Sequence, residues 1–302
     1  MRVAVVIGLI LLLNVAESRA QVYLRADLIG KSPYRDGNNE KIEGTKGSAQ
    51  IYQMGFNLPF AVKMDAYERP QAWGVALNAS YTALHNQQMQ RNLSPDEIMN
   101  IQLSLLHMRS ISEKWSFLAM AGAGIYTSHA RFSDIRGKNI MGHGGAVFIW
   151  HGRKNLQLGA GLALNTSFGF PMAFPALMVN WKLDGKYEVE VNMLNAIELA
   201  AGIKLNDQWK VRLIAEMSGS MTLEELDERE VMFSHQYVLV GLQPVLAIGK
   251  SISIPITIGM STYRAAFYEE RTLKAFFTGM GREYDLCFQI APAFSVAIRY
   301  GF

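Results

Sequence analysis

The chain has little cysteine, no long apolar run beyond its first residues and no strong excess of charge. Cys287 is the only cysteine in 302 residues, so the chain has no internal disulfide to stabilise it. Lys and Arg number 29 and Asp and Glu 26, which gives no electrostatic case for a nucleic-acid partner. Hydrophobic residues make up 50% of the chain, yet they are spread in alternation and not gathered into the segment that a transmembrane helix needs.

Motifs for catalysis and metal binding are also lacking. No two of the histidines have a spacing typical of metal ligands, and no Ser or Asp lies in a recognisable nucleophile motif. A triad can assemble from separate strands at spacings that a sequence hides, so an enzyme inside a barrel is an alternative. We predict that the histidines lie on loop surfaces or in the polar lining of the interior. We also predict no enzyme activity, metal site or cofactor. The histidines are His85, His107, His129, His143, His151 and His235.

The first twenty residues predict a secretory signal peptide. Arg2 precedes an apolar run at residues 3–13, and small residues lie just before the expected cleavage site. A membrane anchor is the alternative, but it needs about 20 apolar residues, and polar residues follow the run here. We therefore divide the chain into a signal peptide, residues 1–20, and one exported domain, residues 21–302.

Segment after segment of the exported domain has a period of two. Every even position from Tyr284 to Phe302 is apolar or aromatic, and the odd positions are small or polar. A turn at Ala291-Pro292 would shift this alternation by one position, and because no shift occurs we predict one long strand. Shorter alternating stretches predict further strands at residues 22–29, 75–82, 99–105, 115–124, 156–165, 209–218 and 252–261.

The second face of these strands is mostly Gly, Ala, Ser and Asn with isolated charges. A soluble sandwich would also alternate, but its outward face would be rich in Lys, Glu and Thr. The pattern therefore favours the inside of a barrel.

The predicted connections alternate between short and long. Short turns are expected at residues 112–114, 151–155, 184–186, 206–207 and 249–250. Longer links are expected at residues 85–97, 128–139, 219–233 and 264–282, with a loop helix within 222–230. Short periplasmic turns and longer extracellular loops are typical of outer-membrane barrels. The sequence therefore predicts an all-β fold, a transmembrane antiparallel β-barrel of about 14 strands in the outer membrane.

Five tryptophans lie close to predicted short turns. Indole rings favour the headgroup level of a membrane, so we interpret these residues as an aromatic girdle at the periplasmic interface. Chance placement of buried tryptophans near turns is the alternative. The residues are Trp73, Trp115, Trp150, Trp181 and Trp209.

The last residues resemble the ending of bacterial outer-membrane β-barrel proteins, and the layout resembles small single-domain barrels of unknown function. In that group the last strand ends in an aromatic residue, with apolar residues at every second position before it, and the barrel-assembly machinery reads this ending. The resemblance implies outer-membrane lipid and that machinery as partners. The matching positions here are Phe294, Val296, Ile298, Tyr300 and Phe302.

Two functions fit such a barrel. A barrel this wide holds either large side chains or water, and small inward residues with sparse charges of both signs favour a passive pore for small solutes. The alternative is a non-conducting barrel that binds partners through its outer loops. The lumen-lining candidates are Arg25, Asp27, Glu188, Glu190, Glu198, Lys204, Lys210, Arg212, Glu216, Asp285 and Arg299.

Overall fold

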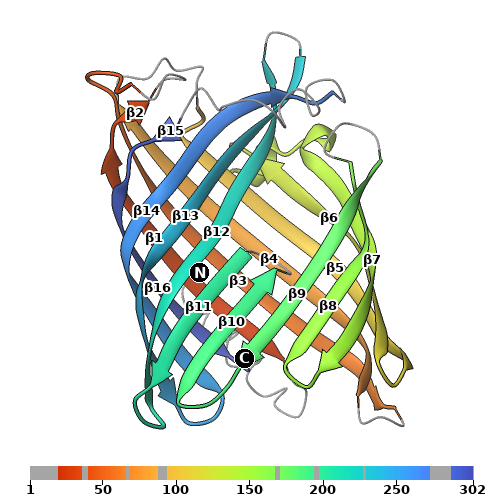
Figure 1. Ribbon diagram of the computed structural model, residues 1–302. Helices are drawn as coiled ribbons and strands as arrows, with labels where there is room; N and C mark the ends of the chain where they lie inside the picture. The colour runs from red at the N-terminus through yellow and green to blue at the C-terminus, as the bar shows by residue number, and fades with distance from the viewer. Residues whose placement is uncertain are drawn as a thin grey trace, which may run out of the picture.

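The computed structural model shows a closed, all-β barrel (Figure 1). It describes residues 20–35, 40–65, 69–87, 94–166, 171–193, 197–226, 229–272 and 287–301. The predicted signal peptide apart from Ala20, together with Asp285 and Phe302, lies outside the described residues. No helix among the described residues is long and apolar enough to span a bilayer.

Fourteen strands of the described chain form the ring, as the sequence predicts. Each strand pairs antiparallel with its neighbours in chain order, and the last strand pairs with both the first and the penultimate, which closes the sheet. The ring strands are β1 (Gln21–Ser32), β3 (Lys46–Met64), β4 (Pro70–Gln87), β5 (Glu97–Ser112), β6 (Trp115–Thr127), β7 (Ile140–Arg153), β8 (Leu156–Asn165), β9 (Met172–Leu183), β10 (Tyr187–Met193), β11 (Ile197–Lys204), β12 (Trp209–Leu226), β13 (Arg229–Ile248), β14 (Ile252–Glu270) and β16 (Ala291–Tyr300). Two-residue strands β2 (Tyr34–Arg35) and β15 (Cys287–Phe288) pair with each other, and 3-10 turns η2 (Phe132–Asp134) and η3 (Gly137–Asn139) lie between β6 and β7.

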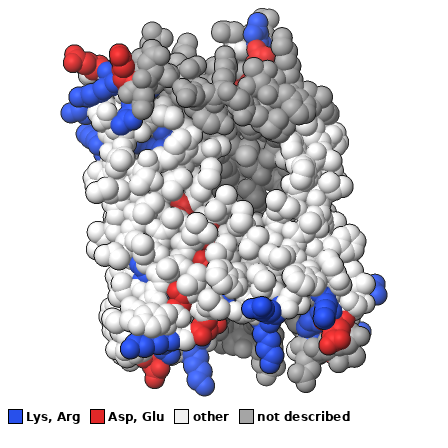
Figure 2. Space-filling view, in the orientation of Figure 1, with Lys and Arg blue, Asp and Glu red and all other residues white. Residues whose placement is uncertain are grey.

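The two-residue period of the strands sorts side chains into an inner and an outer set. Along β1, Leu24 and Leu28 face outward and are exposed, whereas Asp27 is fully buried inside. The same outward position is apolar on strand after strand, as a surface in contact with lipid requires. On the face shown in Figure 2, charged residues gather at the two ends of the barrel, with a broad, mostly uncharged band between them.

The two ends of the barrel differ. We call the end that carries the tight turns before β6, β8, β10, β12 and β14 the turn rim, and the opposite end the loop rim. At the loop rim, Lys138 of η3 bonds to Glu225 of β12 at 2.6 Å. This bond and the positive charge of Lys138 lower the pKa of the exposed Glu225 carboxyl, so this carboxyl is ionised at neutral pH.

The prediction of one uninterrupted strand over residues 284–302 is wrong in part. No hairpin turn forms at Ala291-Pro292, but the ladder breaks at Gln289 and Ile290, where the Gln289 N–H donates to the Pro33 carbonyl. The break shifts the alternation by one residue. Phe288 therefore packs in the interior, and Cys287 takes the opposite face, although the odd positions of this stretch, Cys287 among them, share the small or polar pattern that favours the lumen.

The loop helix expected within residues 222–230 does not form. Residues 222–226 instead continue β12 and pair with residues 229–233 of β13, for example Leu223 with Met232. Leu223 is buried against Tyr126 and Met141, and this packing outweighs the helical capping signal in the sequence.

Buried side chains fill the barrel near the loop rim. Tyr34, Phe233 and Tyr237 are at most 1% exposed, and they cluster with buried residues of β1 to β5 and β13 to β16, on one side of this part of the lumen. We call this cluster the loop-side core. Its members are Ile29, Tyr34, Ala49, Ile51, Leu84, Ile98, Phe233, Tyr237, Leu239, Ala266, Phe288, Ala291 and Ala293.

The loop-side half of β12 leans across the lumen toward β5. Its pairing with β11 stops at Met217, and beyond that point the Asn100 side chain of β5 bonds to both backbone groups of Met221. Asn139 similarly donates to the Leu223 carbonyl at 3.0 Å. Two side-chain amides thus pair with backbone groups at the edge of β12 that a neighbouring strand would otherwise hydrogen-bond.

Candidate functional site

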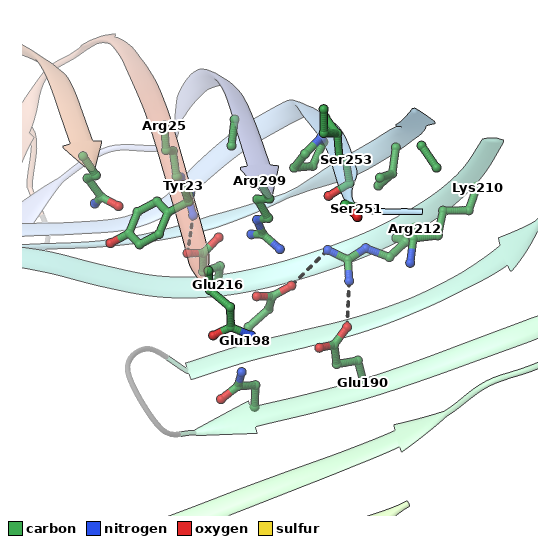
Figure 3. Close-up of a pocket in the computed structure, with 18 of the residues that line it drawn as sticks. Tyr23, Arg25, Glu190, Glu198, Lys210, Arg212, Glu216, Ser251, Ser253 and Arg299 are labelled. Carbon is green, nitrogen blue, oxygen red and sulfur yellow. Dashed lines mark hydrogen bonds and ion pairs between the residues drawn. The ribbon is translucent and has the colours of Figure 1, made fainter. Parts of the chain in front are cut away.

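A polar cavity of about 840 Å³ occupies the half of the lumen next to the turn rim. Its walls come from β1, β3, β4, β5, β9 to β14 and β16, and part of this lining is drawn in Figure 3. The turns at residues 206–208 and 249–251 also line it, so the cavity opens at the turn rim. We call it the vestibule.

The inner end of the vestibule is a buried network around Arg25. Its guanidinium contacts Asp27 at 2.7 Å and Glu216 at 2.5 Å, and the Tyr237 hydroxyl donates to the second Asp27 oxygen at 2.8 Å. Asp27 is fully buried, and two residues further along β1 Ile29 belongs to the loop-side core. The lining thus changes from charged to apolar within four residues of one strand, where the vestibule ends.

A second network joins three neighbouring strands of the wall. Arg212 of β12 reaches Glu190 of β10 at 2.9 Å and Glu198 of β11 at 3.1 Å, as Figure 3 shows. The same guanidinium donates to the side-chain oxygen of Gln243. The NH₂ group of Gln243 in turn donates to the Thr257 hydroxyl at 2.9 Å. One cation therefore neutralises two carboxylates, and fixed partners hold its planar fork in place.

The opposite wall of the vestibule is uncharged and rich in amides. Gln53, Asn78 and Gln102 line it from β3, β4 and β5, together with Ser80. The Tyr23 hydroxyl donates to Asn78 at 3.3 Å. The cavity therefore presents ionised groups on the β10 to β12 side and neutral donors and acceptors on the other, which suits hydroxyl, amide or zwitterionic groups of a solute.

The structure gathers most of the lumen-lining candidates in this one place. The vestibule is lined by Arg25, Glu188, Glu190, Glu198, Lys204, Lys210, Arg212, Glu216 and Arg299. Asp27 lies directly behind Arg25, and Lys210 bonds to Glu188 at 3.0 Å. Asp285 lies outside the described residues.

The tryptophans and the C-terminal positions lie on the outer surface. Trp73, Trp115 and Trp209 are exposed near the turn rim, Trp150 is the ladder partner of Trp115, and Trp181 lies near the end of β9. Phe294 and Ile298 point outward from β16, the strand that closes the barrel. Val296 and Tyr300 occupy alternate positions on the same face of this strand. A girdle and an assembly signal therefore stay predictions, with Phe302 outside the described residues.

Sequence reasoning missed the residues that close the lumen. Phe233 and Tyr237 lie in and just beyond a segment expected to be a loop, so nothing marked them as inward. Arg264 is 1% exposed and lies 3.6 Å over the Phe288 ring, and its Nε donates to the His235 imidazole at 3.1 Å. The period of two does mark Asn100, Gln102 and Ser104 as one polar face, and this signal could have identified Asn100 and Gln102 as lining.

Two serine–histidine pairs form across strands, as the enzyme alternative allowed. Ser104 lies 2.8 Å from His143 Nε2, and Ser116 lies 2.7 Å from His151 Nε2. The buried Nδ1 of His143 has no hydrogen-bond partner among the described residues, so no carboxylate orients this imidazole as in a catalytic triad. The described chain also holds no cluster of three or more metal-ligating side chains.

Comparisons with known proteins were made with the sequence and with the structure. The sequence model of the family described as Domain of unknown function (DUF6268) matches residues 16–301. No curated protein matches the chain.

Several solved structures overlap with most of the barrel. The translocator domain of the autotransporter NalP from Neisseria meningitidis is 10% identical with a TM-score of 0.36, over 94% of this chain and 88% of that one. The outer membrane protease OmpT from Escherichia coli is 9% identical with a TM-score of 0.29, over 94% and 96%. The toluene transporter TodX from Pseudomonas putida is 8% identical with a TM-score of 0.33, over 93% and 88%. These overlaps assign no activity to the chain.

Proposed function

The chain belongs to the family described as Domain of unknown function (DUF6268), and from its geometry we propose that the protein is an outer-membrane channel for small molecules. The turn rim faces the periplasm and the loop rim faces outward, as is usual for barrels with short turns at one end. The exposed apolar positions of the strands support the membrane location.

The vestibule is the observation that carries this proposal. A space of about 840 Å³, lined by polar and charged groups, has no role in a barrel that serves only as a membrane anchor. Most of its charges are paired within the wall, so they do not present a strong field of one sign to a solute. We therefore expect weak ion selectivity and a preference for small molecules with polar groups.

The loop-side core blocks the part of the lumen next to β1 to β5 and β13 to β16. Fully buried aromatic side chains occupy this part beyond Asp27, so passage through it along the axis requires them to move. The same core favours the second candidate, a non-conducting barrel that acts through its outer loops.

Planar-bilayer recordings of the wild type and of core variants test the proposal. Phe233→Ala and, separately, Ile98→Ala remove buried side chains that β13 and β5 contribute to the loop-side core. We expect little conductance from the wild type and clearly larger steps from both variants. Such truncations cost about 2 to 5 kcal/mol, so heat-modifiable gel migration must first show that each barrel is folded. Folded variants that never conduct would overturn the channel and favour the second candidate.

A further inference from the structure

The strands between β9 and β12 are shorter than their neighbours, so the described barrel wall does not reach as far toward the loop rim there. β10 and β11, which lie between them, have only seven and eight residues, whereas β12 has 18. The β9–β10 ladder includes Asn180 and Leu183 but no residue of 172–179, and the β11–β12 ladder stops at Met217. Figure 1 shows this step, with β10 and β11 ending well below the tops of their neighbours.

The gap above β10 and β11 has defined borders. Met193 and Ile197, the last ladder pair of the β10–β11 hairpin, form its sill. Residues 172–179 of β9 and 218–226 of β12 form its sides, and a hydrogen bond of 3.2 Å from Arg271 to the Thr166 carbonyl bridges its top. We call this opening the window. Two strands separate its sides at the sill, which corresponds to about 14 Å at the usual strand spacing.

The β12 side of the window is a stable edge. The backbone of Met221 bonds to Asn100, and the Leu223 carbonyl accepts from Asn139, so neither group needs a strand in the window. Buried contacts of Leu223 with Tyr126 and Met141 hold β12 in this position. Among the described residues, which exclude 167–170 and 194–196 at its borders, the opening is thus part of the folded wall.

The sill lies within the apolar band of the membrane. Met217, the ladder partner of Ile197, is eight residues along β12 from Trp209 near the turn rim. At about 3.3 Å per residue and a tilt of about 40°, the sill is about 20 Å above that level, inside a band about 25 Å tall. Outward residues next to the sill are apolar and exposed, among them Leu177, Ile197 and Leu199.

The polar vestibule begins directly behind this apolar sill. Asn192 and Glu198 form the ladder pair just below Met193 and Ile197, and both line the vestibule. On the β12 side, Ser218 and Gly219 line the vestibule at the level where the window begins. A molecule that occupied both spaces would have a polar part in the vestibule and an apolar part in the bilayer.

We propose that the window is a lateral portal, through which the vestibule binds a membrane amphiphile by its polar head while the apolar chain stays in the bilayer. The inference rests on the proposed function, because it takes the vestibule as the solute site, and it adds the substrate class and the route. A purely polar solute gains nothing from an opening onto hydrocarbon. A purely apolar one would leave the polar vestibule groups without partners. An amphiphile satisfies both surfaces, and the loop-side core obstructs the axial route on the side of β1 to β5 and β13 to β16.

Photo-crosslinking with a lipid probe tests this portal. The folded protein is placed in vesicles that contain phosphatidylethanolamine with a diazirine near the end of one acyl chain, irradiated, and mapped by mass spectrometry. We expect adducts on inward residues at the window, such as Ala176 and Ser218, besides those on the outer belt. Adducts confined to outward residues would mean annular lipid only and would overturn the inference.

Two matched substitutions on β9 sharpen the test. Ala176 has the inward phase of Met178 and Asn180, and Leu177 points outward and is 69% exposed. Ala176→Phe adds bulk in the window and should abolish the inward adducts, whereas Leu177→Phe should keep them. Equal inward labelling of both variants would contradict the portal. If Ala176→Phe does not fold, the wild-type adduct map still decides the matter.

The outcomes separate this inference from the channel itself. Conductance by the Phe233→Ala variant without inward adducts would leave the channel and remove the portal. Inward adducts with core variants that are folded but silent would remove the axial channel and leave a lipid-binding vestibule.

Discussion

Arg212 shows at the residue scale how the vestibule wall tolerates several carboxylates in a membrane. Its side chain is 5% exposed and contacts Glu190, Glu198 and Gln243. Removing one partner of such a group is costly because the remaining charges have no compensation. The pairing also limits how much charge the wall shows to a solute.

We predict that Arg212→Met lowers the free energy of unfolding by about 2 to 3 kcal/mol, less than a deeply buried pair because both carboxylates keep some contact with water. Urea unfolding in vesicles measures the change. The matched control is Arg229→Met, whose partner Glu270 and own side chain are both exposed at the loop rim, and which should cost less than about 1 kcal/mol.

A triple variant separates charge from packing. Arg212→Met combined with Glu190→Gln and Glu198→Gln removes the two uncompensated charges, and it should recover most of the lost stability. A triple variant as unstable as the single one would show that Arg212 acts by packing, contrary to the account.

Much of the vestibule could be predicted from single residues, because a charge at an inward phase of a membrane barrel has only the lumen to face. Glu188, Glu190 and Arg212 are examples, and they lie together in the structure. The distinction between Arg25, which lines the cavity, and Asp27, which is sealed behind it, depends on Tyr237 from a strand 210 residues away. No local pattern contains that contact.

At the scale of elements, Asn100 takes the place of a strand beside β12. Its amide donates to the Met221 carbonyl at 2.6 Å and accepts from the Met221 N–H at 3.3 Å. Without it, both backbone groups would face the interior unpaired, which costs about 1 to 3 kcal/mol.

We predict that Asn100→Ala loosens residues 218–226 of β12 while the rest of the barrel stays folded. Hydrogen exchange of the Met221 amide should become about tenfold faster or more, since 1.4 kcal/mol corresponds to a factor of ten. Gln102→Ala, at the next inward position of β5, is the matched control and should leave that amide unchanged. Equal rates in both variants would show that the Asn100 bonds do not hold β12.

Strands were predictable where one face is apolar and the other is small or polar, as in β5, β8 and β12. The last strand was harder, because the break at Gln289 comes from a hydrogen bond to Pro33 that the period of two does not contain. The extension of β12 and β13 was missed for a related reason. Residues 222–226 resemble a capped helix locally, and only the packing of Leu223 makes them a strand.

At the scale of the whole molecule, the barrel has two unlike halves. The half at the turn rim encloses the vestibule, and the half at the loop rim holds the loop-side core on the side of β1 to β5 and β13 to β16. The sequence predicts a closed ring of about 14 strands and its orientation. It does not predict that the lumen is filled at one end, because that depends on how far β12 leans toward β5.

Thiol accessibility from each side of the membrane tests the central claim, a vestibule open to the periplasm and closed outward. In a Cys287→Ser background, Ser253→Cys places a thiol on the vestibule wall, and Ser133→Cys places one at the exposed loop rim. The reagent is a maleimide on a hydrophilic polymer too large to pass through diffusion porins. In intact cells we expect it to label Ser133→Cys alone, and after the outer membrane is opened it should label Ser253→Cys as well. Labelling of Ser253→Cys in intact cells at the rate of Ser133→Cys would contradict the account.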